Sequence, residues 1–155
     1  MHPFLALIAA MTIALFGSTQ QAWAQESSSL VIDDVWGSPS IGGSKVGVAY
    51  FSATNTSEED IAIIAVTSTA SETVELHTHF IADDIMQMRK IEEVTVPAGH
   101  TVMAKPHALH LMLIDLNQPL GEGETYPVTF HLNNDKKVEG TLTIKPRPNR
   151  HGHHD

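Results

Sequence analysis

The sequence predicts an all-β protein, an antiparallel β-sandwich or barrel in a single domain. Short apolar or alternating segments recur about every 8–12 residues, as in such folds. Clusters of Gly, Pro, Asn and Asp separate these segments, and no long segment has a helical period. A length of 155 residues fits one domain rather than two.

The expected strands follow from these apolar patterns. We expect them at 45–54, 61–66, 73–80, 109–116, 125–132 and 138–144. Segment 109–116 is apolar on both faces, which predicts a central strand. The segment Asn133–Asp135 consists of residue types that favour turns, and it predicts a hairpin between the last two strands. Ala82–Asp84 predicts another hairpin, between 73–80 and 85–91.

The N-terminal segment 1–24 is expected to be a cleaved secretion signal. The uncharged apolar run from Phe4 to Phe16 is shorter than the roughly 20 residues that span a bilayer. Ala22-Trp23-Ala24 follows it and matches a small-x-small cleavage site. The mature chain would then start at Gln25 and contain no membrane span. Because no Lys or Arg precedes the apolar run, an uncleaved membrane anchor is the alternative.

The C-terminal segment 146–155 is expected to be a flexible tail, which leaves 25–145 as the folded domain. Prolines and a glycine in this segment disfavour regular structure. It also carries three histidines, His151, His153 and His154.

Composition excludes several classes of protein. The chain has no cysteine, so it has no disulfides, zinc fingers, thiolate-bound blue copper or iron–sulfur centres. Nine Lys and Arg against 18 Asp and Glu give an acidic protein that repels nucleic acid and anionic lipids. A hydrolase is disfavoured because no G-x-S-x-G motif is present. An oxygenase that uses an N-terminal histidine is disfavoured by the predicted start at Gln25. We therefore expect no enzyme.

Histidine and methionine are concentrated in one region. All methionines beyond the signal fall between residues 86 and 112, namely Met86, Met88, Met103 and Met112. Five histidines lie in or just before that window, namely His77, His79, His100, His107 and His110. Both side chains are ligands for late transition metals. Singly, each has an ordinary alternative, a methionine as core filler and a histidine as a solvated surface residue.

Four of these residues are expected to meet at one end of the sandwich. His110 and Met112 are two residues apart on a strand and so share a face. His77 lies on the polar face of 73–80, and Met88 lies on its hairpin partner. Two imidazoles and two soft thioethers suit Cu(I) better than Zn(II) or Ca(II). Four neutral ligands also leave only one positive charge to be desolvated.

The spacing of these four residues resembles that of the periplasmic Cu(A) chaperone family, PCu(A)C, whose signature is His-x10-Met-x21-His-x-Met. His77, Met88, His110 and Met112 fit this signature without a gap. The surrounding segments are similar to the family as well, namely 74–77, 86–89, 96–99 and 110–113. The resemblance runs from about Val46 to Ile144.

The resemblance implies a cupredoxin-like β-sandwich with Greek-key connections. It implies a periplasmic chaperone that binds Cu(I) through the two histidines and two methionines, and we expect a monomer. Its acceptor would be a protein of cytochrome c oxidase CuA-centre assembly, either oxidase subunit II or a thiol-bearing assembly factor. The histidine tail is similar to extensions that add a Cu(II) site in some relatives. A solvated polar terminus is the alternative for that tail.

Further residues and a second function stay open. His79 shares a face with His77 and is a secondary candidate, either as a spare ligand or as a support to the ligands. Met86 would replace Met88 if the hairpin register differed by one pair. The alternative function is a periplasmic copper or zinc buffer that has no specific acceptor.

Overall fold

The computed structural model describes residues 29–146, and every regular element in that range is a strand. The ten strands are β1 (Leu30–Gly37), β2 (Val46–Asn55), β3 (Ile61–Ser68), β4 (Ser71–Ala82), β5 (Ile85–Lys90), β6 (Val94–Val96), β7 (Thr101–Met103), β8 (His110–Leu116), β9 (Thr125–Leu132) and β10 (Lys137–Ile144). Within this range no helix is long and apolar enough to cross a membrane. The predicted signal, the mature start and all but the first residue of the predicted tail lie outside the described residues.

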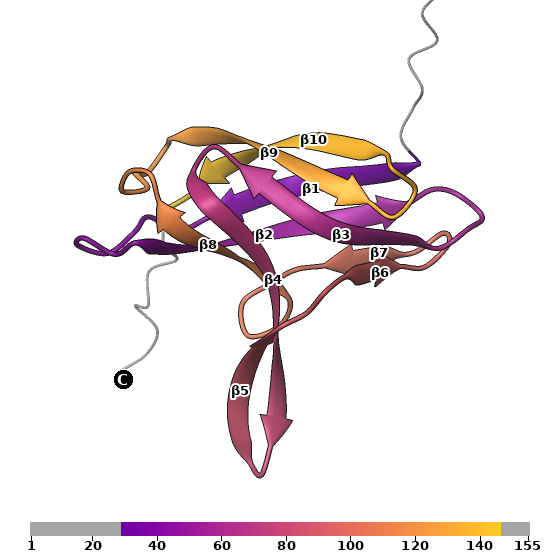
Figure 1. Ribbon diagram of the computed structural model, residues 1–155, viewed down its shortest axis with the longest axis horizontal. Helices are drawn as coiled ribbons and strands as arrows, with labels where there is room; N and C mark the ends of the chain where they lie inside the picture. Colours follow the sequence, from indigo (N-terminus) through magenta and orange to yellow (C-terminus); the bar gives the residue numbers. More distant parts are fainter. Residues whose placement is uncertain (1–28, 147–155) are drawn as a thin grey trace, which may run out of the picture.

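The strands form one hydrogen-bonded sheet that folds over into two layers. The order is β5-β4-β8-β2-β1-β10-β9-β3-β6, and β7 pairs with β2 beside this path. The rings of Phe51 on β2 and Phe130 on β9 meet edge-on, with centroids 5.1 Å apart, although their strands are not neighbours in the sheet. The layer containing β9 therefore packs against the layer containing β2 (Figure 1).

Alternation along β2 shows how the core is built. Its inward positions, which include Ala49, Phe51 and Ala53, are buried, whereas Val48 and Tyr50 between them are only half-buried. Successive side chains of a strand point to opposite faces, so an apolar residue can lie on either side. Val48 and Tyr50 thus form part of an outward-facing apolar surface on the layer that contains β8.

The expected all-β sandwich is confirmed, and the six strands expected at 45–54, 61–66, 73–80, 109–116, 125–132 and 138–144 agree with the structure to within two residues at each end. Three strands were missed, namely β1, β6 and β7. β6 and β7 have three residues each, too few to show a period. β1 carries a register shift between Asp33 and Trp36, and Asp34 has a left-handed φ of 46°. This bulge interrupts the alternation that would have revealed the strand.

The sheet is mixed rather than purely antiparallel. β1 runs parallel to β10, with Trp36 opposite Thr143 and Gly37 opposite Ile144. In the strand order this pair links β5-β4-β8-β2-β1 to β10-β9-β3-β6. A parallel pair between the first and last strands depends on contacts between the two ends of the domain, which local patterns do not reveal.

The predicted hairpin between 73–80 and 85–91 is present and projects away from the sandwich (Figure 1). The strand β4 pairs with β8 from Ser71 to His77 and with β5 from His77 to Ala82. Asp83 and Asp84 form the two-residue turn, and both have positive φ, 53° and 59°. Asp tolerates this conformation better than most residues, and two such residues match a type I′ turn. The hairpin is therefore locally specified.

We predict that Phe130→Ala lowers the free energy of unfolding by about 3–5 kcal/mol, because it opens a cavity between the layers. Phe130 is fully buried. The measurement is urea unfolding at neutral pH. Phe80→Ala is the matched control, since Phe80 lies on the projecting hairpin with Arg89 5.0 Å above its ring. We expect it to cost about 1 kcal/mol or less. Equal losses in both variants would contradict this account of the core.

Candidate metal centre

The outward face of β5, β4, β8 and β2 brings the predicted ligands together. In the register, His77 lies opposite His110, and His79 lies opposite Met88. Met112 lies between Glu75 on β4 and Val48 on β2. Residues that are directly opposite in a sheet share a face and lie within contact distance. All four residues of the predicted ligand set therefore lie on one face, although they come from three strands.

His110 is the most buried of the four, with 3% of its surface exposed. Its Nδ1–H donates to the carbonyl of Ala108 at 2.9 Å, and its Nε2 lies 3.1 Å from the sulfur of Met88. Burial lowers the pKa of His110, and the nearby His79 and His77 lower it further, against the raising effect of the Ala108 hydrogen bond. The ring is therefore neutral at pH 7, with its proton on Nδ1. Two lone-pair donors, Nε2 and the sulfur, then face each other without a hydrogen between them, as in a metal site.

His77 is held by a charged network. Its Nε2–H donates to one oxygen of Glu75 at 2.9 Å, and Lys90 Nζ donates to the other at 2.9 Å. These hydrogen bonds, first from His77 and then from Lys90, lower the pKa of Glu75, so the carboxylate stays charged. A carboxylate that orients a histidine in this way is common next to metals.

The other ring nitrogen of His77 is the feature that suits a metal. Within residues 29–146, Nδ1 of His77 is the buried side-chain nitrogen or oxygen that has no hydrogen-bond partner. In the tautomer that donates Nε2–H to Glu75, Nδ1 carries a free lone pair. A buried, unpartnered acceptor costs free energy, and a bound cation would satisfy it. The residues present therefore fit a copper ion held by His77 together with the thioethers.

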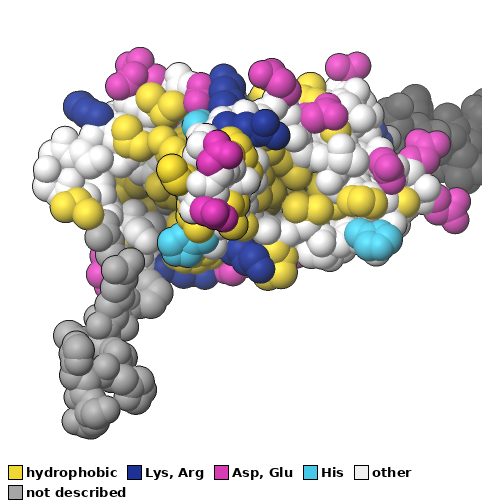
Figure 2. All heavy atoms as spheres, turned by 90° about the horizontal axis from the view of Figure 1, so that it is seen from below, with side chains coloured by type: hydrophobic (Ala, Val, Ile, Leu, Met, Phe, Trp, Pro, Cys, Tyr) yellow, Lys and Arg dark blue, Asp and Glu magenta, His cyan; other side chains and the backbone are white. Residues whose placement is uncertain are grey.

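An open pocket of about 440 Å³ lies on this face. It is lined by Val48, Tyr50, His79, Met88, Pro106, His107, His110 and Met112. Three of the four predicted ligands line it, whereas His77 does not. Hydrophobic side chains gather around the projecting hairpin on the side seen in Figure 2, with histidine among them. The pocket thus combines apolar walls with imidazole and thioether donors.

The donors on this face include thioethers as well as imidazoles. Within the described part of the chain, no three His, Cys, Asp or Glu side chains are grouped so that they could hold a metal ion. Methionine sulfur favours Cu(I), because soft donors prefer soft ions.

The secondary ligand candidates differ in whether they line the pocket. Met86 lies opposite Ile81, two residues further out along the hairpin, and does not line the pocket. The register therefore places Met88, and not Met86, beside His110. His79 lines the pocket, and its ring centroid lies 5.0 Å from that of His110. The tail histidines His151, His153 and His154 lie outside the described residues.

His107 also lines the pocket, and sequence reasoning gave it no role. It has a left-handed φ of 64°, and its ring centroid lies 6.2 Å from that of His79. A bulky residue in this conformation is uncommon and is often found at functional sites. The sequence does show that His107 lies just before β8, in the connection that leads to His110. This position could have indicated that His107 lies near the site.

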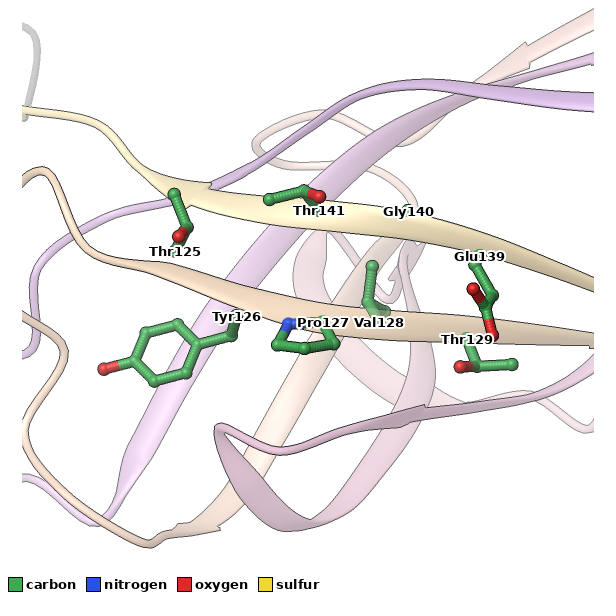
Figure 3. A pocket seen from close by; sticks show the side chains of 8 residues that line it. All are labelled: Thr125, Tyr126, Pro127, Val128, Thr129, Glu139, Gly140 and Thr141. Carbon is green, nitrogen blue, oxygen red and sulfur yellow. The ribbon is translucent and has the colours of Figure 1, made fainter.

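A second cavity, also of about 440 Å³, lies on β9 and β10, away from these ligands (Figure 3). It is lined by Thr125, Tyr126, Pro127, Val128, Thr129, Glu139, Gly140 and Thr141. It has no imidazole or thioether, and its single charged group is Glu139. This chemistry gives no support for a transition-metal site there.

Two solved structures that share this fold are described as copper-bound domains or proteins. The copper-bound PCuAC domain from PmoF2 superposes with a TM-score of 0.65 at 16% identity, over 76% of this chain and 93% of that one. The solution structure of CuI-DR1885 from Deinococcus radiodurans gives a TM-score of 0.61 at 24% identity, over 82% of this chain and 85% of that one. At these identities the likeness shows the fold. The cupredoxin-like fold of PCuAC domains, expected from the resemblance, is confirmed.

Sequence comparison places the chain in a family. A protein of Leifsonia xyli subsp. xyli (strain CTCB07), named "Putative lipoprotein Lxx21020", is 23% identical in an alignment of 145 residues that covers 89% of this chain and 86% of that protein. The family model described as "Putative lipoprotein LpqE-like" matches residues 30–144, from the first strand to the last. The chain therefore belongs to the LpqE-like family.

Proposed function

We propose that this protein is an exported copper chaperone that binds one Cu(I) through His77, Met88, His110 and Met112. Its task would be to deliver the ion during assembly of the CuA centre of cytochrome c oxidase. The observation that carries the proposal is the contact between His110 Nε2 and Met88 Sδ at 3.1 Å, two lone-pair donors on the shared outward face. In the tautomer that donates Nε2–H to Glu75, the unpartnered Nδ1 of His77 adds a third donor.

The four donors differ in exposure, which suits an ion that must be released. Met88 is 46% exposed on the projecting hairpin, whereas His110 is 3% exposed. An acceptor's thiolate or imidazole could replace the exposed thioether first, while His110 still holds the ion. Ligand exchange of this kind needs no change in the oxidation state of copper. The arrangement therefore supports transfer rather than permanent storage.

The fold comparisons support a copper-binding role. Two of the structures that share this fold are described as copper-bound, the PCuAC domain from PmoF2 and CuI-DR1885. On this fold, the present chain carries imidazole and thioether donors on one face. The identity of the acceptor remains part of the proposal, either oxidase subunit II or a thiol-bearing assembly factor, and so does the monomeric state.

The proposed location is the cell envelope, in the periplasm. The relative from Leifsonia xyli and the matched family are both described as lipoproteins, which supports export. The 155 residues contain no cysteine to which a lipid could be attached. We propose that the segment 1–24 is a cleaved signal, because a short apolar run is followed there by Ala22-Trp23-Ala24. A second, Cu(II) site at His151, His153 and His154 stays a prediction.

We predict that residues 25–155 bind one Cu(I) tightly. The double variant His110→Ala, Met112→Ala should weaken this binding by roughly 100-fold or more, because it removes two of the four proposed ligands. The measurement is competition against a colorimetric Cu(I) chelator. The matched control is His100→Ala, Met103→Ala, which removes the same residue types from exposed positions off the site. Unchanged binding in the first variant would rule out this site.

Transfer distinguishes a chaperone from a copper or zinc buffer. We predict that the Cu(I)-loaded protein passes copper to the soluble CuA domain of oxidase subunit II, or to that domain in the presence of a thiol-bearing assembly factor. The measurement is the copper content of the acceptor after mixing and chromatographic separation of the two proteins, with equimolar Cu(I) chelate as the control donor. Tight Cu(I) binding without transfer to either acceptor would favour the buffer.

We predict that Glu75→Gln weakens Cu(I) binding by up to about tenfold, although Glu75 is not a ligand. The amide cannot hold His77 with the same charge, so His77 Nδ1 is less well oriented and less basic. The same chelator competition measures the effect. Glu72→Gln is the control, because it makes the same change at an exposed position of β4. Equal affinities for the Glu75 and Glu72 variants would show that the carboxylate has no role.

A further inference from the structure

Two histidines of β4 face the proposed copper site, and they have different surroundings. His77 is bound to Glu75, is opposite His110, and does not line the open pocket. His79 lies two residues further along the same face, is opposite Met88, and lines the pocket. The strand thus offers one imidazole at the inner side of the site and one at its open side.

One backbone carbonyl orients two of the imidazoles. His79 Nδ1–H donates to Ala108 O at 3.3 Å, and His110 Nδ1–H donates to the same oxygen at 2.9 Å. In the neutral rings this leaves both Nε2 atoms as lone-pair donors. Fixing the tautomer through the other nitrogen is how proteins prepare histidines for metals.

The spacing of the rings favours a shared ion. An imidazole nitrogen binds such metals at about 2.0 Å, so two rings on one tetrahedral ion have centroids roughly 5 Å apart. His79 and His110 are 5.0 Å apart by this measure, whereas His77 and His110 are 5.9 Å apart. By ring spacing, His79 is the better placed partner of His110.

We propose that His79 is an alternative copper ligand, which takes over from His77 when the ion moves to the open side of the site. This inference rests on the proposed function. His110, Met88 and Met112 would serve both positions, with one β4 histidine bound at a time. This agrees with the absence of a three-imidazole group from residues 29–146.

The exchange is balanced without a co-reactant. The bond from copper to His77 Nδ1 breaks, and a bond to His79 Nε2 forms. His77 keeps its proton on Nε2, toward Glu75, and His79 keeps its proton on Nδ1, toward Ala108. Copper remains Cu(I), so no electron is transferred.

A double-mutant cycle on residues 25–155 tests the proposal by Cu(I) chelator competition. We expect His77→Ala to weaken binding by about tenfold, because His79 replaces the lost imidazole, and His77→Ala, His79→Ala to weaken it by a further 100-fold or so. In the His77→Ala background, His79→Gln should weaken Cu(I) binding as much as His79→Ala does. Its amide can still donate to Ala108 but supplies no imidazole, which separates ligation from support of the fold.

Proton NMR of the imidazole rings gives a direct readout, because Cu(I) is diamagnetic. In His77→Ala, the ring signals of His79 should shift on addition of Cu(I), while those of His100, an exposed residue off the site, should not. The proposal is overturned if the His77→Ala protein binds no Cu(I), or if removal of His79 from it changes neither affinity nor spectrum. Absence of Cu(I) binding by the wild-type chain would instead overturn the proposed function.

Discussion

The pairing of β4 with two different partners is the constraint on which the site depends. From Ser71 to His77 the strand is bound to β8 within the sandwich, and from His77 to Ala82 it is bound to β5 outside it. His77 is the residue at which the partner changes. This places donors from a rigid layer beside a donor from an exposed hairpin, so one side of the site is fixed and the other is accessible. A slip of one residue would turn every donor of β4 to the opposite face.

Hydrogen bonds to the donors prepare them in two ways. On the inner side, Glu75 accepts a hydrogen bond from His77 Nε2 and forms an ion pair with Lys90, while His77 Nδ1 has no partner among the described residues. On the open side, the Ala108 carbonyl accepts from both His79 and His110. The unpartnered nitrogen and the facing lone pairs of His110 and Met88 cost stability in the free protein. A cation that removes these costs would also stabilise the fold, because binding to the native state alone shifts the unfolding equilibrium.

Much of the fold could be predicted because most strands have a clear local pattern. The alternation in β4, the apolar run of β8 and the turn at Asp83 and Asp84 are local properties of the chain. β1 was missed because a bulge at Asp34 interrupts its alternation, and its parallel pairing with β10 joins residues more than a hundred positions apart. No local pattern encodes such a pairing.

The sequence by itself determined which donors exist and which of them share a face, because side-chain direction along a strand follows from its period of two. His77 with His79 and His110 with Met112 are fixed in this way. Only the tertiary structure decided which donors meet in the pocket, since that depends on strand register and on a loop. The register placed Met88 rather than Met86 beside His110, and it set His79 at the open side. The left-handed turn at His107 and the carbonyl of Ala108 arise from the connection before β8, which has no repeating pattern to read.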